Sequence, residues 1–469
     1  MFVGRERELA ALEKIYEKVG FQMVVVYGRR RIGKTTLLNR FAQGKRVISF
    51  TAQEANDFVN LREFSAKIYS FFGIPLSAGA FSSWKAAFEF LAEKARSERI
   101  LLIFDEFPYA ANANGEICSV LQNCIDQYMK NSQMCVVLCG SHVSWMESEV
   151  LGYKSPLFGR RTAQIKIDGF DYYDAARFMG GSGTEDIINY YACIGGTPYY
   201  LSQIDTSCSF KENIRALYFT PSGYLCDEPL MLLRQELREP ALYNSIIAAI
   251  ATGASRLNEI SIKIGEPTSK TIKYINTLVA LKILYKTVPF GENPERSRNG
   301  IYRIADNCFT FWYRFVFLDR QAIDSGFGDE TANSAFKNLS NYTGHIFETI
   351  CRQYLVRESR RGRLPFSATE FGSWWGNDPK KREQTDIDVV ASDSAKENII
   401  LGECKWRETQ KLSAADVQTW MDKTYLLSDY GNRYYYCFTK KTFVDSVIKM
   451  SKGKKNLALI TADMMLMNE

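Results

Sequence analysis

The chain has 469 residues, of which 46% are hydrophobic, and a formal net charge of +6. This composition excludes a globally disordered chain, and no apolar run approaches the roughly 18 residues of a membrane span, so we expect a cytoplasmic protein of several domains with no membrane partner. The modest charge permits contact with nucleic acid without requiring it. The 11 cysteines are scattered and only 2 histidines occur, so any catalytic metal would need oxygen ligands rather than a zinc site.

A phosphate-binding loop is predicted in the stretch GRRRIGKTT, which follows an apolar, β-branched strand and precedes a helix. Backbone N–H groups of such a loop and of the helix start can cradle phosphates. Lys34 would reach the β- and γ-phosphates, and the Thr35 hydroxyl would bind Mg²⁺. We therefore predict ATP and Mg²⁺ as cofactors, and the predicted nucleotide-binding residues are Gly28, Gly33, Lys34, Thr35 and Thr36.

Two further strands are predicted to end at the same edge of a parallel sheet. The run RILLIFDEF ends in Asp105 and Glu106, and an acid at this edge points into the ligand crevice. Asp105 would hold Mg²⁺, directly or through water, and Glu106 would polarise the attacking water. The run MCVVLCGS ends at Ser141, which either senses the γ-phosphate or is an ordinary turn residue.

Five stretches together resemble the STAND branch of the AAA-type P-loop ATPases: FVGRERELAAL, the GRRRIGKT loop, DEF, CGS and GGTPYYL. The resemblance is to prokaryotic members with a winged helix and a restriction-endonuclease-like domain at the carboxyl terminus. It implies that Gly4 and Arg5 pack at the nucleotide and that Pro198 contacts it from a helical lid. It also implies that Arg160 or Arg161, in SPLFGRR, meets the γ-phosphate, unless the arginine is solvated or paired with an acid.

The middle of the chain is predicted to be helical. Residues 168–235 show helical spacing broken by glycines and match the lid, and residues 236–325 read as three short helices, a two-stranded wing and a connecting helix. Lysines and arginines there permit DNA contact, although such a winged helix also serves as an internal packing module. The stretch DSGFGDETANSA is predicted to be a polar linker.

The last third combines acids on three successive elements. A helix over about 336–357 carries Glu348 at the edge of its apolar arc, DIDVV carries Asp386 and Asp388, and GECKW carries Glu403 and Lys405 on one face of a strand. The αβββαβ order and these residues resemble the PD-(D/E)XK nuclease superfamily.

A hairpin between the two strands would place an acid opposite Glu403. Parity leaves Asp386 and Asp388 both open, and the family pattern favours Asp388. In that reading Asp388 and Glu403 bind Mg²⁺, Glu348 supports the metal, and Lys405 positions the water or stabilises the transition state. The alternative is a fold that retains these acids for salt bridges and only binds a partner.

Arginines at positions 357, 360, 361 and 363 lie close together in the stretch VRESRRGR. We expect them to contribute phosphate contacts to weak, salt-sensitive binding of DNA.

The predicted fold is multidomain α/β. It comprises a P-loop ATPase domain with a parallel sheet (1–167), a helical lid (168–235), a winged helix with a connecting helix (236–325) and a restriction-endonuclease-like α/β domain (330–469). The resemblance implies an ATP-dependent switch that controls a Mg²⁺-dependent DNA nuclease, in defence or mobile-element biology, with a homo-oligomer or a protein partner left open. The alternative function is an ATP-dependent regulator or DNA-binding protein whose nuclease-like domain is inactive.

Overall fold

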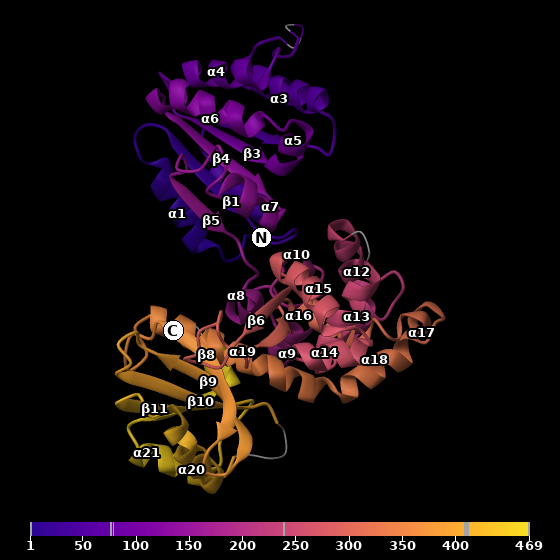
Figure 1. Ribbon diagram of the computed structural model, residues 1–469, viewed down its shortest axis with the longest axis vertical. Coiled ribbons are helices and arrows are strands. Elements are labelled where there is room, and N and C mark those ends of the chain that lie inside the picture. Colours follow the sequence, from indigo (N-terminus) through magenta and orange to yellow (C-terminus); the bar gives the residue numbers. More distant parts are fainter. Residues whose placement is uncertain (1, 76, 78, 238–239, 408–411, 468–469) are drawn as a thin grey trace. The chain divides into compact units, whose positions relative to one another are not determined.

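Apolar runs rich in valine, isoleucine and leucine form the sheet of a first compact unit, Met1–Gly169. The computed structural model describes the whole chain except residues 1, 76, 78, 238–239, 408–411 and 468–469. All strands of this sheet pair in parallel, in the order β2-β3-β4-β1-β5 (Figure 1). The strands are β1 (Gln22–Tyr27), β2 (Val47–Thr51), β3 (Ile100–Asp105), β4 (Met134–Gly140) and β5 (Ala163–Lys166).

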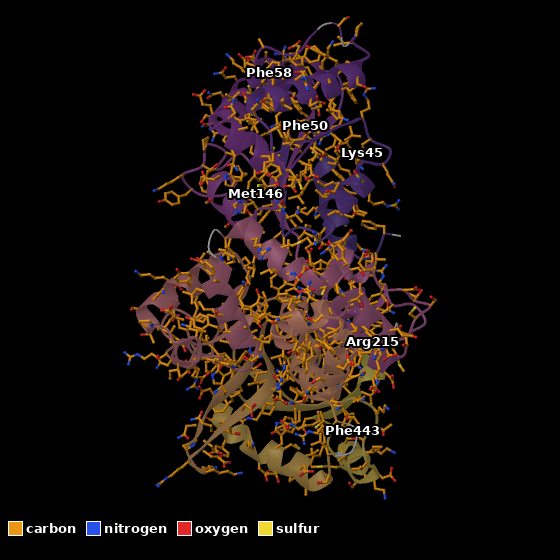
Figure 2. All side chains as sticks on the ribbon, turned by 90° about the vertical axis from the view of Figure 1, so that its right-hand side faces the viewer. Lys45, Phe50, Phe58, Met146, Arg215 and Phe443 are labelled. Carbon is orange, nitrogen blue, oxygen red and sulfur yellow. The ribbon has the colours of Figure 1, made fainter. Side chains whose placement is uncertain are left out.

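Helices cover both faces of this sheet, which is why β1, β3 and β4 are buried along their whole length. The elements are α1 (Glu6–Tyr16), α2 (Lys34–Ala42), α3 (Asp57–Phe72), α4 (Trp84–Lys94), α5 (Phe107–Ala113), α6 (Ile117–Gln127), α7 (Val143–Trp145) and the short turns η2 (Met129–Asn131) and η3 (Met146–Val150). The face covered by α3 and α4 is aromatic: Phe50 lies inside the unit (Figure 2), with its ring 5.2 Å from Phe64 and 5.0 Å from Phe104. Such packed rings hold the strand ends rigidly.

The second compact unit, Phe170–Glu469, begins with helices. They are α8 (Tyr172–Ala176), α9 (Thr184–Ile194), α10 (Pro198–Leu201), α11 (Phe210–Tyr218), α12 (Tyr224–Glu236), α13 (Pro240–Ala251), α14 (Leu257–Ile264) and α15 (Thr268–Ala280). An antiparallel hairpin follows, made of β6 (Leu284–Thr287) and β7 (Ile301–Ile304). The next helices are α16 (Asn307–Phe315), α17 (Arg320–Asp324), α18 (Gly328–Lys337) and α19 (Leu339–Arg360).

A second sheet completes this unit, in the order β12-β11-β10-β9-β8. Its strands β8 (Glu370–Asp378), β9 (Glu383–Ser392) and β10 (Asn398–Lys405) pair antiparallel, whereas β10, β11 (Asn432–Thr439) and β12 (Leu457–Thr461) pair in parallel. One face packs on α19 and the other on α20 (Ala414–Asp422) and α21 (Asp445–Gly453). The remaining elements are η4 (Lys423–Leu427) and α22 (Ala462–Leu466).

The predicted linker over residues 324–335 is wrong. Most of it belongs to α18, which begins at Gly328 and buries Ala332 and Ala335. The segment is mostly polar, but Ala332 and Ala335 are three residues apart, and this spacing puts both on the one face of the helix that packs against the unit.

One hydrophobic cluster runs through the second unit, from Phe170 to Met465. Hydrogen bonds join α9, which lies in the segment predicted to be a lid, to α19: Tyr342 donates to the carbonyl of Ala192 at 2.9 Å, and Thr343 donates to Asn189 at 2.9 Å. The predicted boundaries near residues 235 and 325–330 therefore fall inside one compact unit rather than between separate bodies.

No helix in the ranges that the structure describes combines the length and the apolar character needed to cross a membrane.

Candidate functional site

The GRRRIGKTT loop connects β1 to α2. A Cβ on Gly28 would lie 2.2 Å from the carbonyl oxygen of Ile167, so only glycine fits there. Gly33 has φ 84° and precedes the first turn of α2. Lys34 folds back over the loop, and its Nζ donates to the carbonyls of Gly28 and Arg29, each at 2.9 Å. Burial lowers the pKa of Lys34, so this ammonium is poised to gain from an anionic partner.

The ends of β3 and β4 bring the predicted acids beside this loop. The Thr35 hydroxyl donates to Oδ2 of Asp105 at 2.8 Å, which places these two oxygen groups together at the start of α2. Glu106 has φ 50°, and its Oε2 accepts from the Ser141 hydroxyl at 2.8 Å and from the Ser141 backbone N–H at 3.2 Å. Ser141 thus holds Glu106, a role that neither sequence interpretation of Ser141 included.

The first residues of the chain close the other side of the loop. Gly4 and Arg5 have φ 64° and 67°. The Arg5 guanidinium is buried and donates to the carbonyls of Ile32 and Asp168, at 3.2 and 2.5 Å. Arg5 therefore stabilises the loop by binding these two carbonyls, and its charge is not freely exposed to the loop. Thr36 is exposed on the first turn of α2.

Arg160 lies elsewhere. Its guanidinium binds Oδ2 of Asp126, at the carboxyl end of α6, at 2.5 Å. The neighbouring Thr162 donates to the carbonyl of Met23, at the beginning of β1, whereas the phosphate loop follows the end of β1. Arg160 is thus paired with an acid, which is the alternative to γ-phosphate contact that the sequence left open. The other expected lid residue, Pro198, begins α10 in the second unit.

The second group of predicted residues gathers on α19, β9 and β10. The antiparallel register pairs Gly402 with Val389, so Glu403 comes opposite Asp388 one step further along the hairpin. Oδ2 of Asp388 accepts from the backbone N–H of Cys404 at 2.7 Å, and Nζ of Lys405 lies 2.5 Å from Oε1 of Glu403. Asp386 is exposed, which resolves the ambiguity in favour of Asp388.

The charges of these residues interact strongly. Burial raises the pKa of Asp388 well above its usual range, and the carboxylates of Glu403 and Glu348 raise it further. Burial alone would lower the pKa of Lys405, but the carboxylates of Glu403 and Asp388 raise it. Three acids and one lysine from three elements therefore converge on one region, at an electrostatic cost to the folded chain.

A metal would need oxygen ligands here. Over the described ranges, no group of three or more His, Cys, Asp and Glu side chains is arranged to hold a metal ion. Mg²⁺ commonly takes only one or two protein carboxylates and completes its shell with water and phosphate oxygens. Asp388 and Glu403 offer two such carboxylates, and the negative charge of Glu403 raises the pKa of Asp388.

The predicted arginine patch at the end of α19 is largely occupied. Arg357 is buried, with its guanidinium 3.9 Å from the centre of the Tyr173 ring, and it pairs with Glu358 at 3.3 Å. Arg361 and Arg363 also lie within 4 Å of Glu358, at 3.8 and 3.9 Å. Arg357 therefore has a structural role, and the expectation that it contacts DNA phosphates is wrong.

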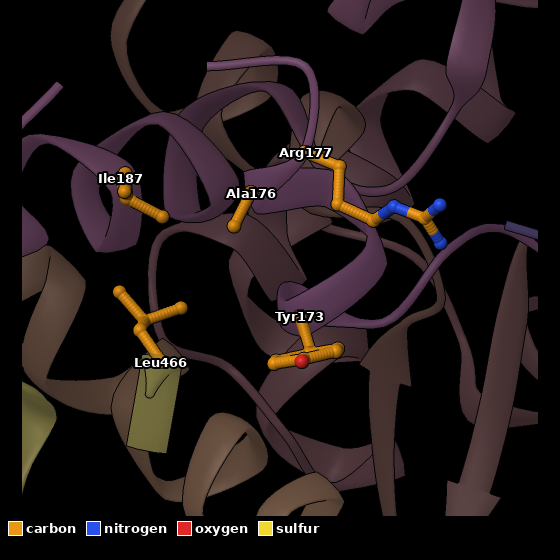
Figure 3. Close-up of a pocket in the computed structure, with 5 residues that line it drawn as sticks. All are labelled: Tyr173, Ala176, Arg177, Ile187 and Leu466. Atoms are coloured by element: carbon orange, nitrogen blue, oxygen red, sulfur yellow. The ribbon is translucent and has the colours of Figure 1, made fainter. Parts of the chain in front are cut away.

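A separate cavity of about 480 Å³ lies between α8, α9 and α22. Ile187 and Leu466 face each other across it, and Tyr173, Ala176 and Arg177 complete its lining (Figure 3). Arg177 is paired with Asp174 at 3.5 Å. This apolar cavity holds none of the predicted site residues.

Comparison with known proteins agrees with the geometry of the loop. Residues 2–204 match a family described as an ATPase domain predominantly from Archaea, and residues 312–417 match a family of archaeal and bacterial proteins of unknown function. The protein MJECL04 of Methanocaldococcus jannaschii is 30% identical over 408 residues, covering 87% of this chain and 88% of its own length. The chain belongs to this ATPase family. A shorter ATP-binding protein of the same organism, MJ0423, is 40% identical over 47 residues, covering 10% of this ATPase and 80% of its own length.

A solved structure supports the fold of this ATPase. The Walker-type ATPase PABY2304 of Pyrococcus abyssi superimposes with a TM-score of 0.52 at 19% identity, covering 66% of this chain and 96% of its own. The chain is thus an ATP-binding P-loop ATPase with a parallel sheet, and a separate carboxyl-terminal sheet lies in its second unit.

Proposed function

We propose that this ATPase is a nucleotide-controlled nuclease whose metal-dependent site is formed by Asp388, Glu403, Lys405 and Glu348. The observation that carries the proposal is the convergence of these four side chains from α19, β9 and β10, with Asp388 kept at an elevated pKa beside two other acids. Structural ion pairs balance their charges, whereas this group has more acids than bases. An unbalanced acidic cluster is typical of a cation site.

Each residue has a distinct task in this proposal. Asp388 and Glu403 would hold Mg²⁺, which supplies a more nucleophilic water and neutralises phosphate charge. The backbone N–H of Cys404 fixes the orientation of the Asp388 carboxylate. The Lys405 ammonium, which is paired with Glu403, would stabilise the negative charge that develops on a phosphate oxygen. Glu348, on α19, would support the metal.

At the nucleotide site, Lys34 would bind the β- and γ-phosphates, while Thr35 and Asp105 would hold Mg²⁺ between them. Glu106, positioned by Ser141, would polarise the attacking water. Binding and hydrolysis of ATP would then control whether the second unit binds nucleic acid.

The experiment is a cleavage assay with labelled DNA and RNA, carried out on the full chain with and without ATP, Mg²⁺ and Mn²⁺. We expect cleavage that requires the divalent metal and changes with ATP. The second candidate is a regulator whose carboxyl-terminal sheet only binds a partner, and the close Lys405–Glu403 ion pair favours it. Absence of cleavage under every combination would support the regulator.

Lys34→Ala is expected to weaken ATP binding by about a hundredfold, because the ammonium is a direct phosphate ligand in a water-poor loop. Titration with a fluorescent ATP analogue measures this. Lys67→Ala, which removes an exposed lysine from α3, is the matched control and should bind like the wild type. An unchanged affinity in folded Lys34→Ala protein would place the nucleotide elsewhere.

Glu106→Gln is expected to preserve ATP affinity within about twofold and to slow hydrolysis roughly a hundredfold, the usual range for loss of a general base. The amide oxygen can still accept the Ser141 hydrogen bonds, so the local structure should survive. Steady-state phosphate release measures the rate. Glu116→Gln changes an exposed glutamate in the same unit and serves as the control; equal rates for both variants would exclude a catalytic role for Glu106.

A further inference from the structure

A cleft lies where the hairpin β6–β7, helix α19 and strand β8 meet, and Glu348 forms part of its wall. Arg303 enters it from β7, Arg352 from α19, and Ser373 and Trp375 from β8. Because Glu348 also acts on the charge of Asp388, this cleft adjoins the acidic site. The hairpin, α19 and β8 thus build one surface beside the proposed catalytic carboxylates.

The hairpin is fixed against the edge of the sheet. The backbone N–H of Phe290, just after β6, donates to the carbonyl of Ser373 at 2.9 Å, and the indole N–H of Trp375 donates to the carbonyl of Asn299 at 3.2 Å. Gly372 permits this approach, because a Cβ there would lie 2.9 Å from the Phe290 ring. The walls of the cleft are therefore built from ordered contacts rather than from a loose loop.

The two arginines of the cleft are half-buried. Within the part of the chain that the structure describes, neither guanidinium forms a hydrogen bond or an ion pair with the protein. Arg352 lies four residues after Glu348, a spacing that allows an ion pair, but Glu348 instead lies 3.9 Å from Nδ1 of His345. Two half-buried guanidiniums in one cleft, whose donors are not taken up by the residues that the structure describes, favour a bound anion.

The anion that fits is a phosphate of a nucleic-acid strand. Guanidinium groups bind phosphate oxygens in a fork, and phosphates recur along a strand, so one can lie on the arginines while its neighbour reaches the acidic site. A free carboxylate or phosphate would fill the arginine site without using the carboxylates next to it. A nucleic-acid strand can use both neighbouring sites, because one phosphate would bind the arginines while the next would bind the metal held by the carboxylates.

We propose that Arg303 and Arg352 form a phosphate-binding wall that holds a nucleic-acid strand in register with Asp388 and Glu403. This inference rests on the proposed nuclease function, but it makes a separate claim about nucleic-acid binding. In this proposal the β6–β7 hairpin contacts the substrate in addition to packing against the sheet. It also replaces the arginines at the end of α19 as the main phosphate contacts.

The test is DNA binding by the full chain, measured by fluorescence anisotropy with a labelled oligonucleotide in EDTA, so that no cleavage occurs. Each of Arg303→Ala and Arg352→Ala should weaken binding roughly tenfold. The logarithm of the association constant falls as the logarithm of the salt concentration rises, and in the double variant this negative slope should be shallower by about 2. Arg303→Lys/Arg352→Lys, which retains both charges, should stay much closer to the wild type. Arg177→Ala, in the other cavity of this unit (Figure 3), should bind normally.

Thermal unfolding of each variant separates loss of binding from loss of fold. Unchanged affinity in the double alanine variant would overturn the inference, and so would an equal loss in Arg177→Ala. If the wild type cleaves nothing but the double variant loses DNA binding, the phosphate wall stands and the nuclease function fails. If cleavage depends on Asp388 while the double variant binds and cleaves normally, the nuclease function stands and the wall fails.

Discussion

Asp388→Ala and Glu403→Ala should each reduce DNA cleavage by at least about a thousandfold, and Lys405→Ala by roughly a hundredfold to a thousandfold, while all three leave ATP affinity unchanged. Removing either carboxylate removes a ligand of the proposed metal and with it the activated water. Removing the ammonium takes away a charge that stabilises the transition state, a contribution that typically reaches 10² to 10³ for one group.

The three variants differ in a second measurement. The two carboxylate variants should bind Mn²⁺ more weakly in calorimetric titration, whereas Lys405→Ala should bind it at least as well, because an ammonium cannot be a ligand and its ion pair with Glu403 competes with the metal. Asp386→Ala, an exposed acid on the same strand, is the control for both assays. Equal metal affinity in all four variants would contradict the proposed ligand set.

The parts that could be predicted from the sequence are those in which neighbouring residues specify the geometry. The phosphate loop needs Gly28 because the chain passes close to Ile167, and a glycine, lysine and threonine at this spacing after a buried strand leave few alternatives. The order of the acids on helix and strands was likewise readable, because side chains alternate along a strand and Glu403 and Lys405 must share a face.

Contacts that depend on distant elements could not be predicted. Arg160 lies in a segment that resembles the family, yet it pairs with Asp126 of α6, and no local sequence pattern reveals that partner. The choice between Asp386 and Asp388 required the register of the hairpin. Arg303 and Arg352 show no sequence signal at all, because tertiary packing, and not a local pattern, brings the hairpin and α19 together.

The shared core also changes how a nucleotide switch would operate. Lys440, on the loop after β11, is almost fully buried at 2% side-chain exposure and pairs with Glu185 of α9 at 2.6 Å. The Glu185 side chain is 39% exposed, so breaking this pair costs less than the roughly 3–5 kcal/mol of a fully buried pair. A switch that moved the predicted lid away from the second sheet would break this ion pair and also the apolar contacts between α9 and α19. A movement in which α9, α19 and the acidic cluster stay together would keep both sets of contacts.

Asp388→Asn is expected to make the metal-free protein more stable by about 2 kcal/mol or more at pH 8, with little change at pH 4. Burial and the two neighbouring carboxylates raise the pKa of Asp388 in the folded state to about 8, above its unfolded value of about 3.9. Between these values the folded chain keeps a proton that the unfolded chain has lost, so the free energy of unfolding falls as the pH rises.

Asparagine removes this titration and still offers an oxygen to the Cys404 N–H. Thermal unfolding in EDTA at several pH values should therefore show a difference between variant and wild type that grows from pH 4 to pH 8, while Asp386→Asn, at an exposed position, follows the wild type. Adding Mg²⁺ should raise the melting temperature of the wild type more than that of Asp388→Asn, because the cation binds the ionised form. If Asp388 instead anchored a structural ion pair, the variant would be less stable at pH 8 and Mg²⁺ would make no difference. The sign of one stability change thus separates a cation site from a salt bridge, without any cleavage assay.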